Sequence, residues 1–363
     1  MKYLNSLVLT AILLFLPLTS PAQKGSFPGI TQLQSPQKPR LGFMIHGGAG
    51  VIKRGSMTAD QEKEYRTKLE EALLTGYKAL QDGKTSLDAV EAAIRILEDS
   101  PLFNAGKGAV FTADGRNELD ASIMNGKTLM AGGVAGLHHV KNPITLARVV
   151  MERSPHVLMF GDGAEKFAKE QNVELVDEKY FWTKSRWDSL QKVLQEEKEK
   201  AKPAAEPKKV SEMGEPAATL PINRFGTVGA VALDKYGDIA AGTSTGGNTN
   251  KRYGRVGDSP IIGAGTYANN NTCGVSATGD GEYFIRLSIA HDISALMEYR
   301  AMPVQAAADT VIKQKLQTLG GKGGVIAMDK FGNMAISFNS EGMFRAYIDS
   351  DGKPVVEIYG PEK

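Results

Sequence analysis

Apolar positions near the start of the chain predict one buried strand followed by two amphipathic helices. A short apolar run at residues 41–45 indicates a strand, and the glycines of HGGAG (46–50) predict a turn after it. A capping box that starts at Thr58 opens a helix whose apolar residues recur at helical spacing. A second helix is expected to begin near Thr85, and Pro101 should end it.

The middle of the chain changes from short apolar runs to charged and Pro-rich sequence. Glycines separate the apolar runs of residues 101–137, which predicts loops and short strands, and helical spacing returns at 144–153 and 163–171. Charges then crowd a helix-like stretch at 184–202. From about 200 to 225 the sequence is rich in Pro, Ala and Lys, and it buries too little apolar surface to offset its ordering entropy. We expect a flexible linker there.

A repeated pattern in the last third predicts two β-hairpins. AVALDKYGDIAAGTSTGG (230–247) parallels VIAMDKFGNMAISFNSEG (325–342), and each indicates a strand, an Asp-Lys-aromatic-Gly turn and a second strand. Glycine in that turn supplies the positive φ that a tight hairpin needs. Residues 282–300 and 303–318, between the hairpins, have helical patterns. Together these elements predict an α+β fold in which helices pack on antiparallel sheets.

The overall composition is that of a globular protein. Hydrophobic residues make up 42% and charged residues 23% of the 363 positions, and the formal net charge is +2. Because basic and acidic residues are interspersed, we expect neither nucleic acid nor an anionic membrane as the main partner. The single cysteine, Cys273, cannot form an intrachain disulfide, so the core and subunit contacts must hold the protein together.

The first 22 residues have the pattern of a signal peptide. Lys2 precedes an apolar stretch from Leu7 to Leu18, and small residues follow before Gln23. The apolar stretch is too short to span a bilayer comfortably, so an uncleaved anchor is the less favoured alternative. We expect an exported, periplasmic protein without membrane contact after the signal is removed.

The linker passes directly into an apolar strand at the Gly226–Thr227 bond. A threonine at a strand is most simply a β-branched structural residue. However, a preceding glycine leaves its carbonyl open to attack, and an N-terminal threonine can use its own amine as the base. Attack of the Thr227 hydroxyl on the Gly226 carbonyl would give an ester, and hydrolysis of that ester would free the amine.

Two glycine-rich segments after Thr227 contain groups that could bind a substrate. In GRVGDSP, Arg255 and Asp258 could hold the carboxylate and ammonium of an amino acid, or they could form a surface ion pair. In SATGDGE, the Thr278 hydroxyl and the Gly279 N–H could stabilise an oxyanion, or the segment could be a simple helix-entry turn.

Taken together, these motifs resemble the plant-type asparaginase and isoaspartyl peptidase family of N-terminal nucleophile hydrolases. The resemblance runs from Gly42 to Tyr359 and rests on these segments: HGGAG (46–50), LFNAGKGAVFT (102–112), ELDASIMNG (118–126), GTVGAVALD (226–234), STGG…GRVGDSP (244–260) and TGDGE (278–282). It implies a four-layer αββα sandwich that cuts itself into an α chain (23–226) and a β chain (227–363). Both chains would form one composite domain, in a dimer of αβ heterodimers.

The resemblance also assigns roles to single residues. Thr227 would be the nucleophile, released by cleavage after Gly226, and Thr245 would supply a supporting hydroxyl. Around them the resemblance places Arg255 on the substrate α-carboxylate, Asp258 on the α-amino group, Thr278 and Gly279 in the oxyanion hole, Gly281 in the substrate-binding turn, and Asn104 with the HGGAG glycines beside the nucleophile.

No cofactor is expected for catalysis, but a structural sodium ion is implied. The corresponding loop in the family binds sodium through backbone carbonyls, which here would belong to Leu97, Glu98, Ser100, Phe103, Ala105 and Lys107.

The implied reaction is hydrolysis at the β-carboxyl of an L-aspartyl unit, with isoaspartyl dipeptides and L-asparagine as substrates. Glycosylasparaginase is one alternative because it shares GRVGDSP, although this chain has STGG and GDGE where STNG and GNGD are expected. A second alternative is an uncleaved aspartate-binding protein that keeps the clamp of Arg255 and Asp258.

Overall fold

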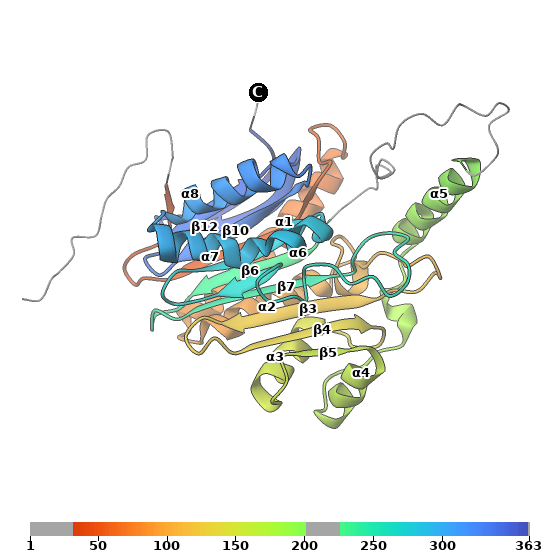
Figure 1. The fold of residues 1–363 in the computed structure, drawn as a ribbon, viewed down its shortest axis with the longest axis horizontal. Coiled ribbons are helices and arrows are strands. Elements are labelled where there is room, and N and C mark those ends of the chain that lie inside the picture. The colour runs from red at the N-terminus through yellow and green to blue at the C-terminus, as the bar shows by residue number, and fades with distance from the viewer. Residues whose placement is uncertain (1–31, 201–225, 362–363) are drawn as a thin grey trace, which may run out of the picture. The chain divides into compact units, whose positions relative to one another are not determined.

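A computed structural model describes residues 32–200 and 226–361, all within the unit Thr31–Lys363 (Figure 1). The expected signal segment (1–22) and residues 201–225 of the expected linker lie outside the described residues. In the part of the chain that the structure describes, no helix is both long and apolar enough to cross a membrane.

The described residues before the linker begin with two strands and end with a helix, and strands and helices alternate in groups between them. In chain order the elements are β1 (Leu33–Gln34), β2 (Gly42–Gly50), α1 (Ala59–Gln81), α2 (Ser86–Glu98), the 3₁₀ turn η1 (Gly106–Gly108), β3 (Leu119–Asn125), β4 (Ala131–Leu137), α3 (Pro143–Arg153), β5 (Leu158–Phe160), α4 (Gly161–Glu170), the 3₁₀ turn η2 (Glu178–Phe181) and α5 (Lys184–Lys200).

The part after residue 226 begins and ends with strands and has its helices between them. Its elements are β6 (Val228–Leu233), β7 (Ile239–Thr245), β8 (Thr266–Ala268), β9 (Cys273–Gly279), α6 (Gly281–Leu287), α7 (Ile289–Arg300), α8 (Val304–Asp309), the π-helical turn η3 (Thr310–Leu316), β10 (Gly323–Asp329), β11 (Asn333–Phe338), β12 (Gly342–Ile348) and β13 (Pro354–Tyr359).

Two sheets organise these strands. The larger has eight strands in the order β13-β12-β2-β6-β7-β3-β4-β5, and the smaller has five in the order β1-β11-β10-β9-β8. All neighbours in both sheets are antiparallel except β4 and β5. The hairpin of β6 and β7 therefore lies at the centre of the larger sheet, and β6 begins one residue after Thr227.

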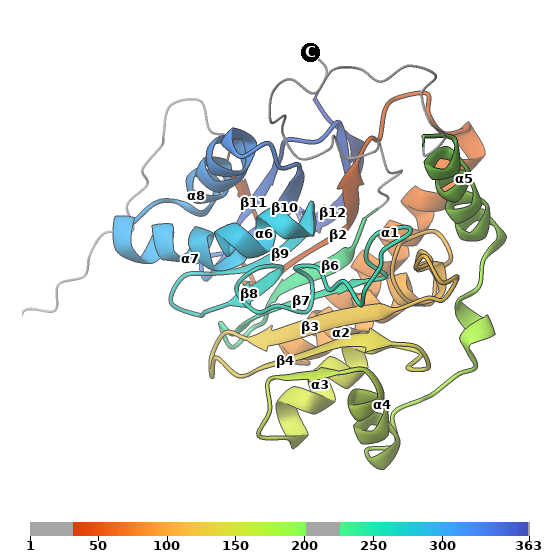
Figure 2. The same cartoon turned by 45° about the vertical axis from the view of Figure 1, so that its right-hand side comes forward.

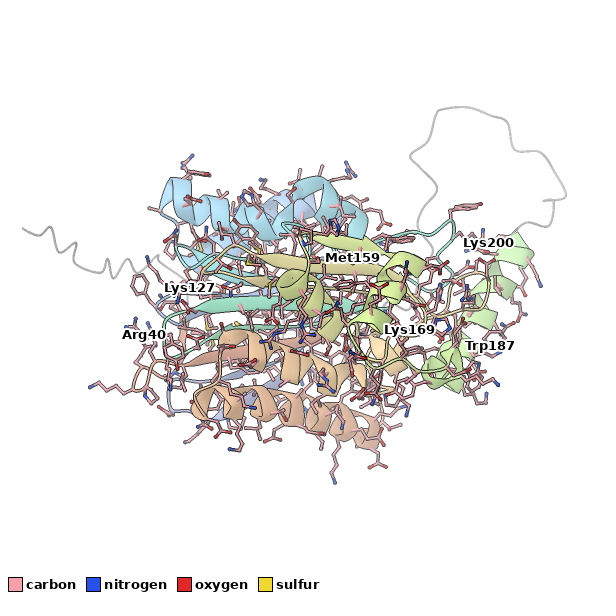
Figure 3. All side chains as sticks on the ribbon, turned by 90° about the horizontal axis from the view of Figure 1, so that it is seen from below. Arg40, Lys127, Met159, Lys169, Trp187 and Lys200 are labelled. Carbon is pink, nitrogen blue, oxygen red and sulfur yellow. The ribbon has the colours of Figure 1, made fainter. Side chains whose placement is uncertain are left out.

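Successive side chains along a strand point to opposite faces of its sheet, and both faces of each sheet are buried. Along β2, Phe43 and Ile45 join the core under α1, α2 and α3, whereas Met44 joins the core shared with the smaller sheet. Along β10, Val325 faces the core under α7 and α8, and Ile326 faces the larger sheet. Figure 3 shows the blue helices of the C-terminal half and the orange helices α1 and α2 on opposite sides of the strands.

Most of the helices are where the sequence pattern predicted them. Thr58 and Thr85 both form complete capping boxes at the starts of α1 and α2, as expected. The helices expected at 144–153, 163–171 and 184–202 are α3, α4 and α5. The mixed α and β architecture predicted from the sequence is thus confirmed.

The turn predicted at HGGAG is wrong, because β2 continues through these glycines to Gly50. Because these glycines have no side chain, other parts of the protein can pack directly against their backbone. A methyl carbon placed on Gly48, which has φ +110°, would lie 2.6 Å from the Gly226 backbone. One on Gly47 would lie 2.6 Å from the Phe103 ring.

Both predicted hairpins are confirmed, and the aspartate of each holds its own turn. In the β6–β7 hairpin, Asp234 Oδ1 accepts hydrogen bonds from the backbone N–H groups of Tyr236 (2.9 Å) and Asp238 (3.0 Å). The other oxygen, Oδ2, accepts from Ser86 N at the start of α2 (2.9 Å). Asp234 therefore joins the central hairpin to a helix, besides stabilising the turn.

Replacing Asp234 should destabilise the protein more than the same change in an isolated turn. Asp349 accepts the same two turn bonds, from Asp351 N and Lys353 N at 2.9 Å, but in the described residues its side chain accepts no hydrogen bond from a helix. Because hydrogen bonds to a charged group contribute about 1.5–3 kcal/mol each, and Asp234 accepts three of them against two for Asp349, Asp234→Ala should lower the thermal midpoint about 1.5 times as far as Asp349→Ala. Equal shifts, followed by circular dichroism, would contradict this account.

Candidate active site

The hydroxyl groups of Thr227 and Thr245 meet at the end of the central hairpin. Val228 on β6 is paired with Ser244 on β7, so the register places Thr227 beside Thr245. Thr227 Oγ1 donates to Thr245 Oγ1 at 3.0 Å, and Thr245 Oγ1 also accepts from Gly247 N at 3.0 Å. Both threonines are buried. The Thr245 hydroxyl therefore orients the Thr227 hydroxyl, an arrangement that suits a nucleophile and its supporting group.

The residue before Thr227 is packed so tightly that only glycine fits. A methyl carbon on Gly226 would lie 2.6 Å from Thr278 Oγ1 and 3.1 Å from Ala49 N. Thr278 Oγ1, at the end of β9, accepts from Ala49 N at 3.3 Å. Gly226, at the Gly226–Thr227 bond, is therefore packed against both β2 and Thr278.

A buried imidazole lies next to this bond. His46 on β2 is opposite Gly229 in the sheet, and its Nε2 is 2.9 Å from Ser276 Oγ. Burial lowers the pKa of His46 to about 3, although the Thr227 backbone acts in the other direction. A side chain on Gly229 would collide with both Ser276 Oγ and His46 Nε2. The imidazole is therefore neutral at neutral pH and fixed in place.

Arg255 and Asp258 both lie close to Gly281. A methyl carbon on Gly281 would lie 2.8 Å from Arg255 Nη2 and 2.9 Å from Asp258 Oδ1. Within the described residues Arg255 forms its ion pair with Glu282, through Nε at 2.8 Å and Nη2 at 2.9 Å, and not with Asp258. The surface ion pair considered for Arg255 and Asp258 is therefore wrong.

Asp258 is a buried carboxyl group with unused binding capacity. Its Oδ2 has no hydrogen-bond partner among the described residues. Burial raises the pKa of Asp258 to about 7, and the positive charge of Arg255 offsets part of that rise. A buried carboxylate with a vacant acceptor is suited to receive a small cationic group.

The other residues expected at the site lie nearby. Asn104 donates to Gly247 O (2.7 Å) and accepts from Val110 N (3.0 Å), so its amide supports the turn that follows Thr245. Gly279, at the end of β9 with φ +157°, follows Thr278 directly. The structure thus brings Thr227, Thr245 and Thr278 together and places Arg255 and Asp258 around Gly281.

The loop after α2 brings backbone carbonyl groups close to two glycines. The backbone carbonyls of Glu98, Pro101 and Phe103 face Gly106 and Gly108 so closely that a side chain on either glycine would collide with them. Within the described residues no cluster of three or more His, Cys, Asp or Glu side chains could hold a metal. Neutral carbonyl oxygens are ligands that suit a hard cation better than a transition metal.

Sequence reasoning missed three side chains that complete the site. His46 stands in the HGGAG motif and Glu282 ends TGDGE, so both lay inside segments already singled out. Ser276 precedes the same TGDGE turn by two residues. Their partners lie far away in sequence, and only the sheet order brings them together.

Comparison with known proteins gives one consistent result. The family model described as "Asparaginase" matches residues 39–358. The chain is 50% identical over 315 residues to the isoaspartyl peptidase of Salmonella typhimurium, covering 87% of this chain and 97% of that protein. The Escherichia coli isoaspartyl peptidase is also 50% identical over 315 residues, covering 87% and 95%. The plant-type L-asparaginase of Pyrococcus furiosus is 43% identical over 309 residues, covering 85% and 96%.

His46 should make the protein sensitive to acid. The folded protein resists protonation of His46 down to about pH 3, whereas the unfolded chain takes up that proton near the ordinary value of 6.5. The unfolded state therefore binds more protons between these values, and stability falls as the pH decreases through that window, by up to about 1.4 kcal/mol per pH unit.

The test compares thermal midpoints from pH 7 to pH 4. His46→Gln should lose stability at pH 7 but show a shallower decline in acid than the parent. His156→Gln, which removes an exposed imidazole, is the control and should decline in parallel with the parent. Parallel curves for all three proteins would refute the assignment.

Proposed function

Because this chain belongs to the asparaginase family, we propose that it hydrolyses the β-amide of L-aspartyl compounds. It removes N-terminal isoaspartyl residues from dipeptides and converts L-asparagine to aspartate and ammonia. The relatives named isoaspartyl peptidase and L-asparaginase cover most of the chain, and the protein is an enzyme of this hydrolase family. The single observation that carries the mechanism is the hydroxyl pair of Thr227 and Thr245 at a glycine peptide bond.

The first step of the proposal is cleavage of the chain by itself. The Thr227 hydroxyl oxygen attacks the Gly226 carbonyl carbon, the C–N bond breaks, and the nitrogen takes up the hydroxyl proton to become a free amine. Water then hydrolyses the Gly226 ester. The packing of Gly226 against Ala49 and Thr278 supports this step, because it holds the residue at the scissile bond in a fixed position.

The freed amine then serves as the base for substrate hydrolysis. It takes the proton of the Thr227 hydroxyl while the oxygen attacks the β-carbonyl carbon of the substrate. Thr245 orients that hydroxyl, and Thr278 with the Gly279 N–H stabilises the oxyanion. The amine or ammonia leaves with the proton, and water releases aspartate from the resulting ester.

The head of the substrate is recognised by two charged groups. The α-carboxylate binds the Arg255 guanidinium, and the α-ammonium binds the carboxylate of Asp258, whose Oδ2 is without a partner in the described residues. A side chain on Gly281 would collide with both groups, so glycine at this position keeps them open to the substrate. Isoaspartyl dipeptides and asparagine share this head, which explains why one site accepts both.

The finer architecture is part of the same proposal. The helix and sheet layers correspond to the four-layer αββα sandwich of N-terminal nucleophile hydrolases, formed by an α chain (23–226) and a β chain (227–363). We further propose export directed by residues 1–22, assembly as a dimer of αβ heterodimers, and a structural sodium ion. The ion would be bound by backbone carbonyl oxygens of the loop after α2, those of Leu97, Glu98, Ser100, Phe103, Ala105 and Lys107.

Intact masses under denaturing conditions test the self-cleavage. The parent protein should give two fragments, one of which starts at Thr227. Thr227→Ala should remain whole, whereas Thr227→Ser keeps a hydroxyl and should still be cut. A parent chain that stays uncut after long incubation would refute the N-terminal threonine mechanism.

Substrate affinity should depend on the charge of Asp258. Because burial raises the pKa of Asp258 to about 7, the carboxylate that binds the ammonium is lost as the pH falls below that value. KM for L-asparagine should therefore rise towards acid pH, by about tenfold per pH unit well below the pKa. Asp258→Asn should raise KM at pH 8 and remove this dependence. A parent KM that is flat between pH 5 and pH 8 would contradict the role of Asp258.

A further inference from the structure

Five buried polar side chains form a continuous hydrogen-bonded chain between the two sheets. All five are fully buried, and each comes from a different strand: His46 on β2, Ser276 on β9, Thr243 on β7, Thr266 on β8 and Ser122 on β3. We call these residues the hydroxyl chain. The strands β3, β7 and β2 belong to the larger sheet, whereas β8 and β9 belong to the smaller one. Figure 2 shows β8, β9, β7 and β3 lying next to one another.

Each contact in the hydroxyl chain is short. His46 Nε2 is 2.9 Å from Ser276 Oγ, which is 2.7 Å from Thr243 Oγ1. Thr266 Oγ1 lies 2.6 Å from Thr243 Oγ1 and 2.8 Å from Ser122 Oγ. The chain of contacts therefore crosses between the sheets more than once.

One end of the hydroxyl chain lies near Thr227, and the other end lies near Asp258. His46 is paired with Gly229, two residues after Thr227. At the other end, Ser122 Oγ donates to the backbone carbonyl of Ser259 (2.6 Å), the residue after Asp258. Thr243 adds a second link, because it donates to Gly265 O (3.0 Å) while Gly265 N donates to Asp258 O (3.1 Å).

The hydrogen count shows that the hydroxyl chain cannot carry protons to Asp258. Seven contacts join its five side chains and the carbonyls of Gly242, Gly265 and Ser259. Four hydroxyls and one neutral imidazole supply at most five protons, so the contacts must share them. At the Asp258 end both routes finish on carbonyl oxygens, which accept hydrogen bonds but pass on no proton. What the hydroxyl chain supplies is a fixed geometry.

The hydrogen bonds of the hydroxyl chain connect the two sheets in a directional way, which the apolar contacts of the core do not. Elsewhere the two sheets meet through side chains such as Met44, Val231 and Ile326, whose contacts have no directional preference. Hydrogen bonds are directional, and buried hydroxyls that lose their partners are costly, so a satisfied network holds one sheet in a single position relative to the other.

We propose that the hydroxyl chain is a positioning element that sets the spacing between the nucleophile strand β6 and the Asp258 loop. This inference rests on the proposed function, in which Thr227 reacts with the β-carboxyl of a substrate whose α-ammonium is held by Asp258. A substrate of fixed length can reach both groups only when their separation is right. Small displacements of reacting groups cost large factors in rate and binding.

Thr243 is the residue to change, because it contacts Ser276, Thr266 and Gly265 O and so lies in the middle. Thr243→Val keeps the shape and removes the hydroxyl, and Thr243→Ser restores the hydroxyl. The matched control is Thr272→Val. Thr272 is also buried and pairs with the Ser294 hydroxyl at 2.6 Å, but it is outside the hydroxyl chain.

The readout is competitive inhibition of isoaspartyl dipeptide hydrolysis by L-aspartate and by succinate. Succinate has the two carboxylates of aspartate but no ammonium, so its binding does not use Asp258. Thr243→Val should weaken inhibition by aspartate about three- to tenfold and leave inhibition by succinate unchanged. Thr243→Ser should remain close to the parent, and Thr272→Val should lower thermal stability without changing either inhibition constant.

Several outcomes separate the two proposals. A parent that hydrolyses no isoaspartyl dipeptide refutes the proposed function, and this inference falls with it. An active parent with equal losses for aspartate and succinate in Thr243→Val, or with no loss for either, refutes the positioning role alone. Should Thr243→Val fail to fold, Ser122→Ala interrupts the hydroxyl chain at the Asp258 end, and the same selective loss of aspartate binding is required.

Discussion

The close contact between the Gly226 backbone and Gly48 is the constraint around which the site is built. Neither residue has room for a side chain, and Gly48 takes a left-handed φ to permit the approach. This contact holds the start of β6 against β2 and brings Thr278 from the other sheet to the same peptide bond. The reactive end of the site thus exists where two sheets and one tightly packed peptide bond meet.

Burial shifts three ionisable groups of the site and its surroundings in the direction of their neutral forms. Burial lowers the pKa of His46 to about 3 and raises the pKa of Asp258 to about 7 and of Glu98 to about 8. Glu98 accepts from Ser244 Oγ (2.6 Å), the neighbour of Thr245, and from Ile144 N (3.0 Å) at the start of α3. At neutral pH His46 and Glu98 therefore add little charge near the threonine pair, which suits a nucleophile activated by its own amine.

Features set by a few neighbouring residues could be predicted from the sequence, whereas features set by sheet order could not. The capping boxes of Thr58 and Thr85 and the Asp-x-x-Gly hairpins depend on contacts within four residues, and they were right. The glycines of HGGAG were misread as a turn because their neighbour, Gly226, is remote in sequence. The partner of Arg255 is 27 residues away, and the hydroxyl chain joins five strands. No local pattern indicates either.

The order of strands in the larger sheet has a consequence for how the protein can assemble. β2 lies between β12 and β6, and β7 lies beside β3, so strands from before and after Gly226 alternate in blocks across one hydrogen-bonded sheet. In the proposed mature form, the two fragments can separate only by tearing the sheet apart at its centre. Folding of the intact precursor is unimolecular, whereas separated fragments would have to meet in solution and reassemble at a concentration-dependent rate. Cleavage after folding therefore makes assembly a one-time event, and the lifetime of the mature enzyme is governed by its unfolding rate.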